Sequence, residues 1–122
     1  KCTGMKTLVI GASPKPQRYS YKAFHLLKEH GHETLALGKR AQKLEGWEIL
    51  SGYPLLEDID TVTLYLRAQR QEEYRDYLLR IKPRRVIFNP GAENFQLAEE
   101  LQSVGIKTEN ACTLVLLHTN QY

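Results

Sequence analysis

Small residues at the end of a short apolar run form the first candidate for a binding site. Thr7–Ile10 is rich in β-branched and aliphatic side chains, and it is followed by Gly11, Ala12 and Ser13 before a helical pattern begins at Ser20. A glycine turn that leads into a helix offers free backbone N–H groups and the positive end of the helix dipole, which together bind anions. We therefore expect a phosphate-binding loop here. An ordinary turn between a strand and a helix, binding nothing, fits the same residues.

This loop differs from the glycine-rich fingerprint of dinucleotide-binding folds. That fingerprint requires three glycines, and only Gly11 is present. Lys15 and Arg18 add mobile positive charge to the loop instead. The pattern therefore predicts a loop that binds an anion, but it does not predict NAD as the ligand.

A second group of residues follows the apolar segment 33–37. Folds that bind NAD place Asp or Glu after the second strand, where the carboxylate accepts from the ribose 2′-hydroxyl. Here the segment ends in Gly38, Lys39 and Arg40. Two cations favour an additional 3′- or 2′-phosphate on the ribose and disfavour NAD. A solvated basic loop without a ligand remains the alternative.

Further candidates follow the third and fourth apolar runs. Arg67 comes after the run at 61–66, and Pro90 and Gly91 follow the run at 85–88. A Pro–Gly turn at a helix entrance allows a ligand to approach the backbone closely. We expect Asn94 to cap the following helix rather than to contact a ligand.

Residues for catalysis or for metal binding are missing from the pattern. The four histidines lack metal-ligand spacing, and there is no Gly-x-Ser-x-Gly sequence or phosphate-loop lysine motif. We therefore predict a protein that is not an enzyme. Cys2 and Cys112 form no Cys-x-x-Cys pair, which predicts a reduced, cytoplasmic protein. Cys112 is either a buried structural thiol or a contact, even a mixed disulfide, with a thiol ligand.

Alternating strands and helices must position these residues. Apolar runs and helical spacing predict an α/β fold, a Rossmann-like doubly wound three-layer sandwich with a mostly parallel five-stranded sheet. Helices are expected from Ser20 to Gly31, across Tyr74–Ile81 and from Leu97 to Val104. Expected strands cover 7–10, 33–37, 61–66, 85–88 and 106–108, with a shorter one near 47–49. The apolar tail at 113–117 is expected to pack back on the body.

Length and composition set further bounds. The chain has 122 residues, 42% hydrophobic and 25% charged, which predicts one ordered domain over residues 5–122. Residues 1–4 are interpreted as an N-terminal extension or a cloning remnant. The net charge of +3 is too small to indicate nucleic acid, and no apolar run reaches the roughly 20 residues of a membrane span.

Four segments together carry a resemblance to a known family. In chain order they are Gly11–Pro14, Tyr19–Ser20, Asn89–Asn94 and Asn110–Thr113. From about Met5 onward the chain resembles the small bacterial CoA-binding domain proteins. These are stand-alone relatives of the CoA-binding domain in the α subunit of succinyl-CoA synthetase and in NDP-forming acyl-CoA synthetases.

The resemblance implies a Rossmann-type domain with CoA lying across the strand ends. It implies that the phosphates lie on Gly11, Ala12 and Ser13, with Ser20 at the start of the following helix. It also implies roles near the adenosine for Gly38 and Lys39, along the pantetheine for Pro90 and Gly91, and after the last strand for Asn110 and Cys112. Charge alone adds Arg18, Arg40 and Arg67. Many relatives have Asn-Pro after the second strand, where this chain has its basic residues.

These expectations lead to a non-catalytic module that binds coenzyme A or an acyl-CoA as a sensor, carrier or regulatory unit. The synthetases need a further domain with a phosphorylated histidine, for which 122 residues leave no room. Any reaction would therefore need a protein partner. An NADP-binding Rossmann enzyme or redox-sensing module is the alternative. A third hypothesis is an interaction subunit that binds no nucleotide.

Overall fold

A seven-stranded sheet forms the centre of the computed structural model, which describes residues 4–122. Its strand order is β3-β4-β2-β1-β5-β6-β7, and only β3 pairs antiparallel with its neighbour. The strands are β1 (Thr7–Ile10), β2 (Thr34–Leu37), β3 (Gln42–Leu44), β4 (Trp47–Leu50), β5 (Thr61–Leu64), β6 (Arg85–Phe88) and β7 (Lys107–Asn110). Residues 1–3, which include Cys2 and most of the predicted extension, lie outside the described residues.

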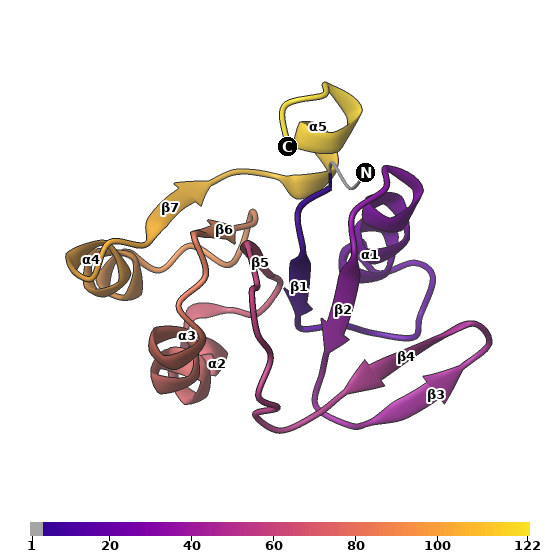
Figure 1. Cartoon of the computed structure of the whole chain (residues 1–122), viewed down its shortest axis with the longest axis horizontal. Coiled ribbons are helices and arrows are strands. Elements are labelled where there is room, and N and C mark those ends of the chain that lie inside the picture. The colour runs from indigo at the N-terminus through magenta and orange to yellow at the C-terminus, as the bar shows by residue number, and fades with distance from the viewer. Residues whose placement is uncertain (1–3) are drawn as a thin grey trace.

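Helices cover both faces of this sheet (Figure 1). The helices are α1 (Tyr19–Glu29), α2 (Ala68–Gln71), α3 (Arg75–Ile81), α4 (Phe95–Ser103) and α5 (Thr113–His118), with a 3₁₀ turn η1 (Glu72–Tyr74) between α2 and α3. α1 and α5 lie on one face, and α2, α3 and α4 lie on the other. The α/β, Rossmann-like three-layer prediction is confirmed.

Side-chain alternation along the central strands produces a core on each face. All four residues of β1 are buried, as expected for a parallel strand covered on both sides. Leu8 and Ile10 belong to the core beneath α3 and α4, whereas Val9 packs with Phe24 and Leu27 of α1. The central strands are therefore rich in apolar residues, which is why their positions could be predicted from the sequence.

The predicted number of five strands is wrong, because a hairpin extends the sheet beyond β2. β3 pairs with β4 around a turn at Gly46, whose φ of 85° favours glycine. Gln42 and Lys43 are exposed on this edge strand. With little apolar surface to bury, β3 lacks the pattern by which strands are recognised.

The start of α1 also differs from the prediction. The helix predicted to begin at Ser20 begins one residue earlier, at Tyr19, with Arg18 as its N-cap, and Ser20 is buried within its first turn. Because Ser20 already has helical backbone geometry, it cannot cap this helix. By contrast, Asn94 caps α4 as predicted, since its side chain accepts from the Leu97 N–H. The tail forms α5, and buried Leu117 confirms that it packs back.

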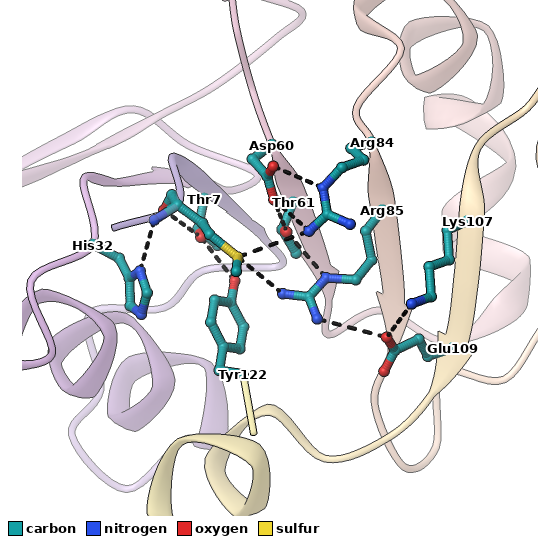
Figure 2. A network of polar contacts seen from close by, with 10 residues as sticks. Thr7, His32, Asp60, Thr61, Arg84, Arg85, Lys107, Glu109 and Tyr122 are labelled. Atoms are coloured by element: carbon teal, nitrogen blue, oxygen red, sulfur yellow. Dashed lines mark hydrogen bonds and ion pairs between the residues drawn. The ribbon is translucent and has the colours of Figure 1, made fainter. Parts of the chain in front are cut away.

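A polar network joins the amino ends of the strands, opposite the predicted binding site (Figure 2). Arg85 begins β6 and is only 5% exposed. Its Nε donates to Thr61 Oγ1 at 3.1 Å, Nη1 lies 3.6 Å from Glu109 Oε2, and the guanidinium stacks 4.6 Å from the Tyr122 ring centre. A buried charge is costly unless it is paired, and these three contacts compensate it.

The same network joins the first and last described segments. The Met5 N–H donates to His32 Nδ1 at 2.8 Å, and the Tyr122 and Thr7 hydroxyls lie 2.7 Å apart. His32 must therefore be unprotonated at Nδ1. Burial lowers the pKa of His32 below its usual range, and the nearby His30 and Arg85 charges lower it further, while Asp60 opposes them.

We expect the free energy of unfolding to fall as the pH drops below about 6.5, because the unfolded chain takes up a proton that folded His32 resists. His32→Asn removes the titrating group and should flatten this dependence in urea unfolding at several pH values. His25, whose pKa burial also lowers, is retained in both proteins and serves as the internal control. If the free energy of unfolding depends on pH equally in the two proteins, His32 is not the group responsible.

Candidate functional site

Two adjoining cavities open at the carboxyl ends of the central strands. The larger has a volume of about 590 Å³ and the smaller about 220 Å³, and Gly11 and Leu66 line both. Gly11 directly follows β1 and Leu66 lies shortly after β5. The strand order reverses between these two strands, which is where open α/β sheets bind ligands.

Gly11 shapes the point where the cavities meet. Its φ is 95°, and a Cβ there would lie 3.0 Å from the carbonyl oxygen of Tyr65. Both Gly11 and Ala12 donate their N–H groups to the Leu37 carbonyl oxygen, at 2.9 and 3.1 Å. A larger residue would therefore separate the loops that follow β1 and β5.

The start of α1 faces the larger cavity. Arg18, Tyr19 and Ser20 all line it. Within residues 4–122 no side chain caps this helix start, and its first turn contains no acidic residue. The first-turn N–H groups and the helix dipole are therefore free to attract an anion.

A buried amide holds the opposite wall. Asn89, which is 1% exposed, follows β6 and precedes the Pro90 turn. Its Nδ2 donates to Thr63 Oγ1 at 2.6 Å and to the Leu64 carbonyl at 2.9 Å. Its Oδ1 accepts from the Thr113 N–H at 2.9 Å. One side chain thus joins β5, β6 and the start of α5.

A second buried amide joins the loops after β5 and β6. Gln71 is fully buried, and its Nε2 donates to the carbonyls of Leu66 and Ala92 at 2.7 and 2.6 Å. Its Oε1 accepts from Asn94 Nδ2 at 3.0 Å. Sequence reasoning missed both amides. Asn89 stands between a strand and a Pro–Gly turn, a signal that could have identified it, but Gln71 has no comparable signal.

The smaller cavity is lined by residues of both charges. Lys39, Arg70 and Glu73 line it, together with Gly38 and other residues. A Cβ on Gly38 would lie 2.9 Å from the Ala12 carbonyl oxygen, so glycine is required where the loops after β1 and β2 touch.

The structure brings most of the predicted site residues together. Those that line the larger cavity are Gly11, Ser13, Arg18, Ser20, Arg67, Pro90 and Gly91. Gly38 and Lys39 line the smaller one. The other four are Ala12, Arg40, Asn110 and Cys112.

These four residues line neither cavity. Ala12 contributes its carbonyl oxygen to the contact with Gly38. Arg40 is exposed beyond β2, and Asn110 is exposed at the end of β7. Cys112 is a half-buried free thiol at the N-cap of α5. Burial raises the pKa of the Tyr65 hydroxyl above its usual range, and the nearby Cys112 raises it further.

Within residues 4–122 the structure contains neither a membrane-spanning helix nor a cluster of metal ligands. No helix within residues 4–122 has the length and apolar character needed to cross a membrane. In the same part of the chain, no three His, Cys, Asp or Glu side chains are grouped so that they could hold a metal ion.

Comparison with known proteins identifies one family and several similar structures. The family described as a CoA binding domain matches residues 5–118. A crystal structure of an uncharacterised protein is 43% identical, with a TM-score of 0.94 over 98% of this chain and 99% of that one. No curated protein matches the chain.

Two more distant structures share the fold. A hypothetical protein from Pyrococcus horikoshii OT3 has a TM-score of 0.85 at 21% identity, over 98% of this chain and 84% of that one. The cell-free ID.343 protein from Thermus thermophilus has a TM-score of 0.83 at 24% identity, over 97% of this chain and 91% of that one.

Replacing Asn89 with alanine should lower the free energy of unfolding by about 2 to 3 kcal/mol, because the buried Thr113 N–H and Thr63 hydroxyl lose a partner. Urea denaturation measures this change. Asn110→Ala, at an exposed asparagine, is the matched control and should change stability by less than about 0.5 kcal/mol. Similar effects of the two substitutions would mean that Asn89 does not hold the site together.

Proposed function

The chain belongs to the CoA-binding domain family, and from that premise we propose that it binds coenzyme A or an acyl-CoA across the carboxyl ends of the central strands. The observation that carries the proposal is the pair of cavities that meet at Gly11 and Leu66. The larger cavity is faced by an open helix start and lined by Arg18 and Arg67, and the smaller cavity is lined by Lys39 and Arg70. This arrangement suits an elongated ligand that has phosphates both in its middle and at one end.

Each part of CoA has a chemically suitable wall in this arrangement. The diphosphate suits the first-turn N–H groups of α1, which no side chain caps within residues 4–122, because a helix start attracts anions. The 3′-phosphoadenosine suits the smaller cavity, where Lys39 and Arg70 supply positive charge. The pantetheine then extends past Pro90 and Gly91, where the turn leaves the backbone accessible. An acyl group would continue in the same direction.

The composition of the larger cavity supports binding rather than catalysis. Within the described chain, its lining contains no His, Cys, Asp or Glu, which are the side chains that most often exchange protons or act as nucleophiles. The residues that it does contain donate hydrogen bonds or provide apolar surface. We therefore propose a sensor, carrier or regulatory role, with any reaction performed by a partner protein.

Thermal unfolding with CoA, acetyl-CoA, NADP and NAD tests this proposal, together with mass spectrometry of any ligand that co-purifies. A ligand at about 100 times its Kd should stabilise the fold by about 2.7 kcal/mol. Stabilisation by CoA supports the proposal. Stabilisation by NADP alone would favour the NADP-binding alternative. A protein that no nucleotide stabilises, but that retains a stable protein partner, would favour the interaction subunit.

The position of the two basic residues after β2 yields a sharper prediction. Lys39 lines the smaller cavity and Arg40 does not. Lys39→Glu should therefore weaken CoA binding by about tenfold or more and affect dephospho-CoA much less, because reversing one charge near a phosphate costs over about 1 kcal/mol. Titration calorimetry with both ligands measures the two ratios.

Arg40→Glu is the matched control for this variant. It changes the net charge by the same amount at the neighbouring position, and it should leave the ratio of CoA to dephospho-CoA affinity nearly unchanged. Equal effects of the two variants on that ratio would mean that only the general charge of the loop matters, and would contradict the proposed position of the 3′-phosphate.

A further inference from the structure

One carboxylate lies among the cations of the smaller cavity. Glu73 lines this cavity with Lys39 and Arg70, and its Oε2 accepts a hydrogen bond from the Tyr53 hydroxyl at 3.0 Å. No ion pair within residues 4–122 joins Glu73 to either cation. Its negative charge is therefore not neutralised by a direct partner. In a site that binds only phosphate, this carboxylate would weaken binding, because it repels an anion.

An aromatic cluster keeps this carboxylate in place. The Tyr53 ring centre lies 5.7 Å from that of Tyr74 and 5.8 Å from that of Tyr77. The Tyr77 hydroxyl in turn donates to the Pro54 carbonyl at 2.7 Å. These contacts fasten the connection between β4 and β5 to η1 and α3. Glu73 is thus restrained from two sides, by its own helical turn and by the Tyr53 hydroxyl.

The protonation of the pair defines what the cavity can accept. The hydrogen bond to Glu73 raises the pKa of Tyr53, so the hydroxyl keeps its proton and remains the donor. An ionised carboxylate accepts hydrogen bonds and donates none. The cavity therefore offers cations for a phosphate and, beside them, an acceptor for a hydroxyl or amino group.

We infer that Glu73 makes the site selective for an adenosine phosphorylated on the ribose 3′-oxygen over one phosphorylated on the 2′-oxygen. This inference rests on the proposed function. A 3′-phosphate leaves the adjacent 2′-hydroxyl free to donate to the carboxylate, while the phosphate meets the cations. With the ribose held in the same orientation by its 5′-phosphate, a 2′-phosphate would place a dianion beside Glu73, which removes the hydrogen bond and adds charge repulsion.

The position of Glu73 also explains the unusual residues after β2. Folds that bind NAD take their ribose acceptor from the residue after the second strand. Here the loop after β2 contributes Gly38 and the cation Lys39, and the acceptor Glu73 comes from η1. A cation after β2 together with a carboxylate from η1 favours a ribose that carries one phosphate and one free hydroxyl.

Two isomeric probes isolate this effect, adenosine 3′,5′-bisphosphate and adenosine 2′,5′-bisphosphate. They have the same charge and composition, so their affinity ratio reports only the position of the phosphate. The unaltered protein should bind the 3′,5′ isomer more tightly in titration calorimetry. Glu73→Gln, which keeps the shape and removes the charge, should reduce that ratio by about fivefold. The reduction should be smaller at high salt, because ions screen exposed charges.

Glu72→Gln is the matched control. Glu72 is the neighbouring glutamate, pairs with Arg75 and does not line the smaller cavity, so its removal should leave the ratio unchanged. If CoA binds and Glu73→Gln leaves the isomer ratio as it was, this inference is wrong and the proposed function stands. If neither CoA nor either bisphosphate binds the unaltered protein, the proposed function is wrong and the inference with it.

Discussion

The three hydrogen bonds of Asn89 are the constraint on which the rest of the site depends. The cavity walls come from loops that follow different strands, and nothing in a parallel sheet itself fixes such loops relative to one another. Asn89 joins β5 and β6 to the start of α5, and Gln71 joins the loops after β5 and β6. Because both amides are buried and use their donors and acceptors within the protein, the walls are in place before a ligand arrives. Binding then costs little ordering of the chain.

The sheet separates its charges from its neutral polar groups. At the amino ends, Arg85 is neutralised by Glu109 and stacked on Tyr122. At the carboxyl ends the loops are joined by the side-chain amides of Asn89 and Gln71, which carry no net charge. Consequently the cations that line the cavities, Arg18, Lys39, Arg67 and Arg70, take no part in the ion pairs of residues 4–122. Their charge remains available to an anionic ligand.

Elements that depend on burial or on turn residues could be predicted from the sequence, whereas edge strands and long-range side-chain contacts could not. The central strands were predictable because they are buried on both faces of the sheet, with Leu8 facing one core and Val9 the other, which favours runs of apolar residues. β3 was not, because an exposed edge strand is held by backbone hydrogen bonds that any sequence can make. The loops around Gly11 and Pro90 were predictable from turn chemistry. The pairing of Tyr53 with Glu73 was not, because it depends on how a connection folds across a neighbouring helix.

The hydrogen bond between Thr7 and Tyr122 joins residues 115 positions apart. Contacts of such separation close a very long loop, and their entropic cost is recovered only after the intervening chain is ordered. We therefore expect the contact between the C-terminal segment and β1 to form late in folding, after the intervening chain is ordered. The same contact is the natural place for the native state to open first, so amide protons near Tyr122 are expected to exchange with solvent sooner than those of the central strands. This one contact thus implies an order of folding that the layered architecture alone does not reveal.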